Sequence, residues 1–137
     1  KDRKALLKGL ETGVIDAIVS AHNPQDPESK DLEFDLSTPG ICSLPSFMSD
    51  LLSLSSSLDL EVLFDKVTNG PRGVLKFDPV KIEKGTRARL AVISPDKEWL
   101  FDASVNPSRS INTPQYNKIL KGKCLAVVNG EELIINS

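Results

Sequence analysis

His22 is the only histidine of the chain, and it lies in the run Ala21-His22-Asn23-Pro24-Gln25, directly before Asp26 and Glu28. Imidazole and carboxylate groups that follow one another closely could bind a metal ion or move a proton. A hydrolytic zinc site, however, needs several His, Cys or carboxylate ligands that converge and leave one position open for water. One histidine does not supply that set, so we expect no metal site made by this chain alone.

The alternative to a functional site is that these polar residues have structural roles only. His22 would then be a hydrogen-bonded polar residue at the end of a strand, rather than a functional group. Asn23, Asp26 and Glu28 would be solvated loop residues rather than ligands. The cysteines Cys42 and Cys124 lie far apart, which favours reduced, buried thiols of a cytoplasmic protein. A disulfide or a metal role is the alternative for them.

Composition limits the classes of protein that the chain can represent. Of 137 residues, 39% are apolar and 26% are charged, which is typical of a globular protein and not of a disordered one. The net charge of −2 disfavours a nucleic-acid-binding domain, which needs a basic face. No apolar run is long enough to span a membrane, and no signal-peptide pattern is present. Since the chain starts with Lys1 instead of methionine, we expect the natural protein to begin upstream.

The residues before His22 predict how it is positioned. Amphipathic spacing over residues 2–10 predicts a helix that Gly13 ends. The β-branched apolar run 14–19 predicts a buried strand, which gives the helix–strand order of an α/β fold. The polar stretch 25–40 predicts a long loop at the carboxyl end of that strand, where parallel α/β folds bind their substrates.

The remaining residues predict two helices and then a small β unit. The helices are expected at 41–54 and 60–67, with Asp59 as N-cap of the second and residues 68–71 as its end. Short apolar runs predict strands at 90–93, 99–101, 124–128 and 133–135, separated by Ser94-Pro95-Asp96 and by Asn129-Gly130, a strong hairpin motif. We therefore divide the chain into an α/β part, 1–73, and a β part, 74–137.

Four segments in this order resemble the end of dihydroorotases of the type that associates with aspartate carbamoyltransferase, in the amidohydrolase superfamily. Residues 9–18 resemble the family run "GL-x-G-x-IDxI", and residues 68–72 resemble "TNPAR". Residues 80–90 resemble "G-x-(I/L)-x-x-G-x-x-ADL", and residues 110–123 resemble "SKNTPF…LKGKV". The resemblance covers nearly the whole chain. It implies an α/β fold in which the C-terminal portion of a TIM (β/α)₈ barrel, 1–73, is followed by part of a small β-sandwich, 74–137.

The family motif at the end of the last barrel strand is "D-H-A-P-H", whose Asp is a zinc ligand and general base and whose second His binds the substrate carboxylate. By this resemblance the Asp position is Ala21, and the position of the second His is Gln25. A methyl group can neither coordinate a metal nor accept a proton. Gln25 can donate a hydrogen bond but has no charge to pair with a carboxylate. His22, Pro39 and Gly40 match positions near the family's substrate, and Ser43 to Ser46 replace the family's "GLET".

These substitutions favour a dihydroorotase-like protein of pyrimidine biosynthesis that is not catalytic. The resemblance implies that it is a structural or regulatory partner of aspartate carbamoyltransferase, cytoplasmic and oligomeric, with no nucleic acid or membrane as partner. Zinc is expected only if the upstream region keeps its ligands. The alternatives are an active zinc-dependent cyclic amidohydrolase acting on dihydroorotate, hydantoin or allantoin, with Asp26 as a substitute base, and an unrelated α/β fragment.

One prediction follows from the single barrel strand expected at 14–19. A lone parallel strand leaves backbone groups unpaired and an apolar face uncovered, so the rest of the barrel must come from the same chain or from another. We expect the 137 residues alone to unfold without a cooperative two-state transition, as measured by thermal and urea denaturation. A sharp cooperative melt from a monodisperse 137-residue monomer would contradict this prediction.

Overall fold

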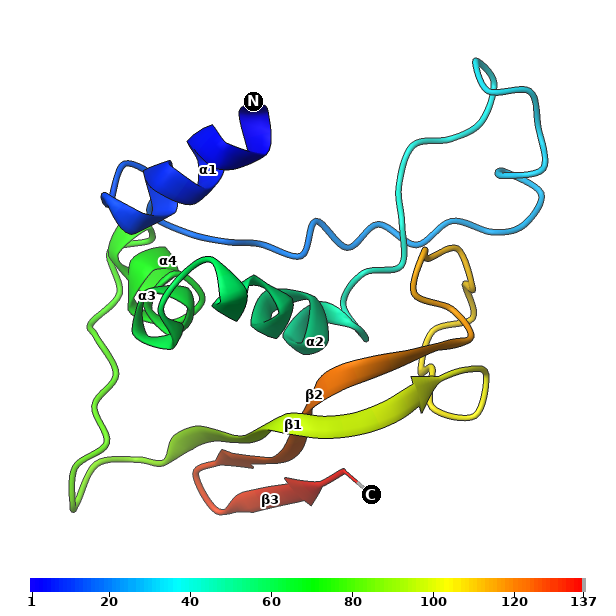
Figure 1. Ribbon diagram of the computed structural model, residues 1–137. Helices are drawn as coiled ribbons and strands as arrows, with labels where there is room; N and C mark the ends of the chain where they lie inside the picture. Colours follow the sequence, from blue (N-terminus) through cyan, green and yellow to red (C-terminus); the bar gives the residue numbers. More distant parts are fainter. Residues whose placement is uncertain (137) are drawn as a thin grey trace. The chain divides into compact units, whose positions relative to one another are not determined.

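The computed structural model describes residues 1–136 and combines short helices with one sheet (Figure 1). The elements in chain order are α1 (Asp2–Glu11), α2 (Phe47–Leu52), the 3-10 helix η1 (Ser53–Ser56), α3 (Leu60–Asp65), α4 (Asn69–Val74), β1 (Arg89–Phe101), β2 (Lys118–Asn129) and β3 (Glu132–Ile135). The chain forms two compact units. The first contains residues 1–19, 51–94 and the chain from 124 onward, and the second contains 20–50 and 95–123.

In the first unit, α1 forms where its sequence predicts a helix. Asp2 lies in the first turn and Lys8 in the last turn, which suits the helix dipole at both ends. Thr12 caps the carboxyl end, and Gly13 follows with a φ of 76°, a left-handed conformation that glycine adopts without strain. Leu10 is buried together with Leu51, Leu52, Leu58 and Leu63, which form the core of this unit.

The strand predicted at 14–19 is not formed. Residues 14 and 15 form a bend, and residues 16–19 run on as an extended segment that pairs with no strand. The backbone N–H groups of Ile15 and Ile18 donate instead to the carbonyls of Gly9, at 3.0 Å, and Lys66, at 2.8 Å. A parallel strand requires neighbours on its edges, and the described residues provide none for this segment. Val14 and Val19 remain 79% and 74% exposed, although their residue type favours a buried strand.

Two of the predicted helices have other bounds than expected. The helix expected over 41–54 begins only at Phe47, because Pro45 disfavours helical backbone at Leu44 and because Cys42 donates its N–H to the carbonyl of Asn112, at 2.8 Å. The helix predicted over 60–67 ends at Asp65, before residues 68–71 as predicted, but a further helix, α4, begins at Asn69. Helix α3 lies within its predicted range, with Asp59 at the N-cap position but without a side-chain capping bond.

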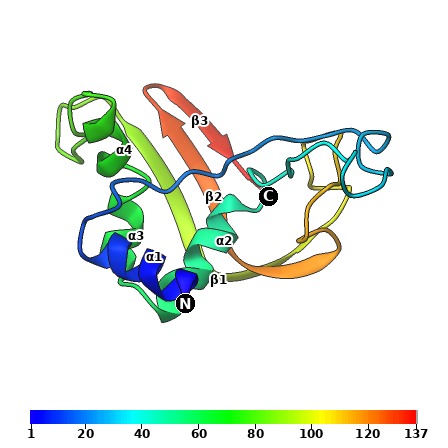
Figure 2. The same cartoon turned by 90° about the horizontal axis from the view of Figure 1, so that it is seen from above.

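The three strands form one sheet in the order β1-β2-β3, and both views show them side by side (Figures 1 and 2). Strands β2 and β3 are antiparallel, with Asn129 opposite Glu132, so Gly130 and Glu131 form the two-residue turn of the predicted hairpin. The turn predicted at Ser94-Pro95-Asp96 is wrong, because β1 continues through it. Proline is tolerated there because β1 is an edge strand of the sheet that the described residues form.

The second unit is organised around Phe101, which is fully buried. Its ring contacts Trp99 and Tyr116, with centroid distances of 5.6 and 6.4 Å. The indole Nε1 of Trp99 donates to the carbonyl of Gly122, at 3.0 Å, and to Oγ of Ser49, at 3.1 Å. These bonds satisfy the polar end of the indole, as a half-buried tryptophan requires.

Both cysteines are free thiols, as predicted. Cys42 is fully buried in the second unit, whereas Cys124 is only half-buried, so the expectation of two buried thiols is confirmed for Cys42 alone. Among the described residues, no helix has both the length and the apolar character needed to cross a membrane.

Gly70 provides a test of how the first unit holds the extended segment. A Cβ atom added at Gly70 would lie 2.1 Å from the carbonyl oxygen of Asp16, whereas one added at Gly73 in the same helix would meet nothing within 4 Å. We expect Gly70→Ala to lower the free energy of unfolding of the full-length protein by about 1–3 kcal/mol, because backbone must move. The matched control Gly73→Ala should be neutral or stabilising by up to about 1 kcal/mol. Equal urea midpoints for the two variants would contradict this account.

Candidate functional site

The candidate residues lie in the second unit, where the stretch 20–23 runs beside residues 41–44. The backbone N–H of Asn23 donates to the carbonyl of Ile41, at 3.0 Å. The hydroxyl of Ser43 donates to the carbonyl of Ser20, at 2.6 Å. The two segments are thus joined by hydrogen bonds at both ends, and His22 lies between these bonds in the sequence. The structure brings His22, Gln25, Pro39 and Gly40 together around this pairing.

His22 has a structural role in this pairing. Its Nδ1 atom accepts hydrogen bonds from the backbone N–H groups of Ser43, at 3.2 Å, and Leu44, at 3.0 Å. A ring nitrogen that accepts two such bonds carries no proton, so the neutral imidazole bears its proton on Nε2. One nitrogen is therefore already engaged and the other presents an N–H group. Neither offers a lone pair to a metal ion without breaking these bonds or losing a proton.

Ala21 has an unusual backbone conformation for its residue type. Its φ is 49°, in the left-handed region that non-glycine residues rarely adopt. This conformation costs an alanine about 1–2 kcal/mol, whereas Asn and Asp adopt it more readily because their short polar side chains can hydrogen-bond locally. The side chain at this position is an exposed methyl group, so it contributes no ligand, acid or base to the site.

Side-chain amides donate hydrogen bonds to the carbonyl of Pro39 and lie close to Gly40. The Nδ2 atom of Asn23 donates to the carbonyl of Pro39, at 3.1 Å, and the Nε2 atom of Gln25 donates to the same oxygen, at 3.5 Å. Gln25 also donates to Oδ1 of Asn23, at 3.0 Å. Gly40 has a φ of 139°, and a Cβ atom there would lie 2.4 Å from the carbonyl oxygen of Asn23, so only glycine permits this approach.

Asn112 is a site residue that the sequence did not single out. Its side-chain Nδ2 donates to the carbonyl of Gly40, at 2.8 Å, and its own carbonyl accepts the N–H of Cys42, at 2.8 Å. The two bonds tie residues 40–42 to Asn112. Asn112 is distant from His22 in the sequence, and the only indication of its role was its place in the segment 110–123 that resembles the family.

Asp26, the possible substitute base, begins the loop that follows. Its Oδ1 accepts hydrogen bonds from the N–H and the hydroxyl of Ser29, both at 2.6 Å. Chiefly because the Ser29 hydroxyl and N–H bond to the ionised form, the pKa of Asp26 lies below the usual value for an aspartate. A carboxylate with a lowered pKa is a weaker base, so this arrangement disfavours Asp26 as a proton acceptor.

The described residues do not fit a zinc ion, the metal that the resemblance implies. Among residues 1–136, no group of three or more His, Cys, Asp or Glu side chains lies close enough together to hold a metal. Around the carboxyl end of the extended segment, the chain offers a methyl group at Ala21, an engaged imidazole at His22 and an amide at Gln25. None of these three groups is a metal ligand as it stands.

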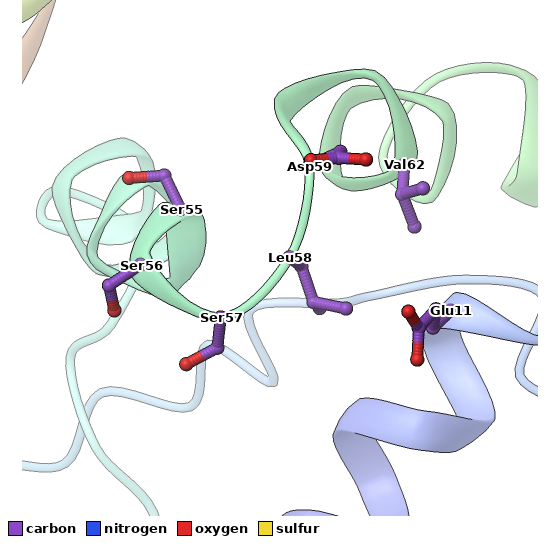
Figure 3. Close-up of a pocket in the computed structure, with 7 residues that line it drawn as sticks. All are labelled: Glu11, Ser55, Ser56, Ser57, Leu58, Asp59 and Val62. Atoms are coloured by element: carbon purple, nitrogen blue, oxygen red, sulfur yellow. The ribbon is translucent and has the colours of Figure 1, made fainter.

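A surface pocket in the first unit is not the predicted site. It has a volume of about 200 Å³, and Glu11, Leu58 and Val62 lie along one side of it (Figure 3). Ser55, Ser56, Ser57 and Asp59 complete the lining. The pocket includes neither a histidine nor a cysteine, and it contains none of the residues predicted to bind substrate.

Comparison with known proteins finds dihydroorotases that are similar to this chain. A dihydroorotase of Aquifex aeolicus is 29% identical over 136 residues, which cover 98% of this chain and 32% of the relative. A dihydroorotase of Citrifermentans bemidjiense is 34% identical over 133 residues, which cover 95% of this chain and 31% of the relative. These dihydroorotases are homologous to this chain over nearly its whole length. The chain spans about a third of the length of the curated relatives that it matches. No protein-family model matches the chain.

Solved structures show that the fold of this chain is similar to part of the fold of larger proteins. A D-hydantoinase (dihydropyrimidinase) from Thermus sp. superposes with a TM-score of 0.79 at 18% identity, covering 97% of this chain and 31% of the other. The inactive dihydroorotase-like domain of a Chaetomium thermophilum CAD-like multifunctional protein superposes with a TM-score of 0.58 at 16% identity, covering 96% and 35%. The predicted α/β class is therefore confirmed for the described residues.

The cause of the lowered pKa of Asp26 can be tested by pH titration. We expect Ser29→Ala to move the pKa of Asp26 upward, because that variant removes the hydroxyl bond to the ionised form. A folded-state pKa below the unfolded value means that the stabilisation exists above the unfolded pKa and is lost as pH falls through the folded pKa. The measurement is a carboxyl carbon NMR titration of the full-length protein.

Asp102 supplies the matched control for that titration. Its pKa is also lowered, chiefly by the hydroxyl and N–H of Ser104. Ser104→Ala should therefore move Asp102 and leave Asp26 unchanged, and Ser29→Ala should do the reverse. If Ser29→Ala leaves the titration of Asp26 where it was, the assigned cause of its low pKa is wrong.

Proposed function

We propose that this chain is the C-terminal third of a dihydroorotase-like protein that is not catalytic and serves as a structural or regulatory partner of aspartate carbamoyltransferase. In this proposal, residues 1–73 complete a (β/α)₈ barrel and residues 74–137 belong to a small β-sandwich. The protein would be a cytoplasmic oligomer of pyrimidine biosynthesis. The substrates and partners named here come from the family, not from the described residues.

Ala21 is the observation that carries the non-catalytic part of the proposal. It stands at the carboxyl end of the extended segment, where the resemblance expects a zinc-binding aspartate. The left-handed φ of 49° suits an aspartate better than an alanine, which supports an ancestral aspartate at this position. Losing such a general base removes about 10²–10⁴-fold of rate. The loss of a metal ligand would add to that effect.

The hydrogen bonds already made by the backbone carbonyls of Pro39 and Gly40 support the same proposal. Ligand pockets recognise substrates with a few precisely placed polar groups, often backbone N–H and C=O. Here the carbonyls of Pro39 and Gly40 already accept hydrogen bonds from Asn23, Gln25 and Asn112. A substrate would have to displace these side-chain donors, which lowers the net gain from binding.

The segment 14–19 supports the barrel. It has the β-branched composition of a buried strand, yet its valines are exposed and its backbone has no strand partner among the described residues. Neighbouring barrel strands would supply both the missing hydrogen bonds and the apolar cover. The superposition on the hydantoinase, of which this chain covers only 31%, is in keeping with that role.

An active cyclic amidohydrolase is the second candidate, and Asp26 is the observation that favours it. This exposed carboxylate lies in the loop directly after the degenerate motif, so it could replace the missing base. Its two hydrogen bonds from Ser29 and its lowered pKa count against that role. The non-catalytic proposal is therefore the better supported of the two.

Assay of the full-length protein separates the two candidates. We expect the zinc-loaded protein to interconvert dihydroorotate and carbamoyl aspartate no faster than a protein-free control, since no carboxylate stands at Ala21. The Aquifex aeolicus dihydroorotase provides the positive control, and Asp26→Ala should leave the background rate unchanged. Turnover by the natural protein that is lost in Asp26→Ala would refute the non-catalytic proposal and establish Asp26 as the base.

A further inference from the structure

The loop over residues 26–38 is closed at its base by its own hydrogen bonds. The N–H of Thr38 donates to the carbonyl of Ser29, at 3.1 Å, and the ammonium of Lys30 donates to the carbonyl of Thr38. Asp26 fixes the first turn through Ser29, and the N–H groups of Leu36 and Ser37 both donate to the carbonyl of Glu33, at 2.9 Å. The loop, light blue in Figure 1, is therefore an ordered Ω-like loop.

This ordered loop exposes three large apolar side chains. Phe34 is 94% exposed, Leu36 66% and Leu32 51%. Phe34 is more exposed than any other large apolar side chain among the described residues. Single exposed apolar residues are common, but three within five positions on one closed loop form a concentrated apolar surface.

Charge surrounds these apolar residues on the same loop. Residues 26–38 contain five carboxylates, at Asp26, Glu28, Asp31, Glu33 and Asp35, against the one ammonium of Lys30. Carboxylates therefore alternate with the apolar residues from 31 to 36. A surface that accepts this loop must cover apolar side chains and must not carry negative charge next to them. An anionic membrane surface is excluded by the same carboxylates.

We propose that the loop 26–38 is a protein-docking element, with Phe34 inserted into an apolar pocket that lysine and arginine side chains surround on a partner protein. The hydrogen bonds at the base of the loop hold it in shape before binding, which lowers the ordering cost of association. Phe34 supplies the buried aromatic anchor of the interface, and Asp31, Glu33 and Asp35 contact its cationic rim. Naming aspartate carbamoyltransferase as this partner rests on the proposed function.

The experiment uses the full-length protein and the aspartate carbamoyltransferase of the same organism, with binding followed by sedimentation velocity. We expect Phe34→Ala to weaken binding at least about tenfold, as truncation of an aromatic anchor does. The joint variant Asp31→Asn, Glu33→Gln and Asp35→Asn should weaken binding and reduce its dependence on salt. Ile119→Ala is the matched control, because Ile119 is 71% exposed in the same unit but outside the loop, and it should bind as the natural protein does.

Hydroxyl-radical footprinting read by mass spectrometry tests whether Phe34 is accessible before the partner binds. Phe34 should be oxidised readily in the free full-length protein and protected in the complex, with the fully buried Phe101 as the unreactive reference. Protection of Phe34 in the free protein would mean that the rest of the same chain covers the loop, which overturns the proposal.

The possible failures are distinguishable. If the natural protein binds the transferase and Phe34→Ala binds equally well, the docking role of the loop is wrong while the partnership stands. If the natural protein does not bind, the partnership is wrong and the assignment of the loop to it is overturned as well. The lack of catalysis is decided separately, by the assay with zinc.

Discussion

Hydrogen bonding of the backbone from residue 14 to residue 25 is the constraint on which the rest of the structure depends. An extended segment normally finds its partners in neighbouring strands. Here residues 14–19 make backbone bonds to Gly9 and Lys66, and residues 20–25 are joined to 39–44 by side chains as much as by backbone. Asn23 and two of the candidate substrate-binding residues, His22 and Gln25, are the groups that hold this segment.

Because these side chains are engaged in holding the backbone, few of their polar atoms are available to bind a ligand or transfer a proton. The Nδ1 atom of His22 already accepts hydrogen bonds from two backbone N–H groups, and the side-chain amides of Asn23 and Gln25 already donate to the carbonyl of Pro39. Polar groups that already make hydrogen bonds help to hold one conformation, and a ligand that binds to them must first displace their present partners. Residue types that can serve catalysis are used here to hold the geometry of a loop.

The elements that the sequence predicted correctly are those whose stabilising groups are local. Helix α1 with Gly13 after it, and the hairpin around Gly130, depend on residues a few positions apart. The predictions that were wrong depend on distant partners. The strand at 14–19 needed neighbours that the described residues do not provide, and the helix at 41–54 begins late because Cys42 bonds to Asn112. Pro95 suggested a turn, but an edge strand accommodates it.

The sequence by itself determined which side chains are available at the expected site: one histidine, a methyl group at Ala21 and an amide at Gln25. Only the tertiary structure decided how these groups are used. The tautomer of His22, the left-handed backbone of Ala21 and the clamp by Asn112 arise from contacts between segments far apart in the chain. Residue type limits the chemistry of a side chain, but the contacts of the folded chain set its proton, its orientation and its exposure to solvent.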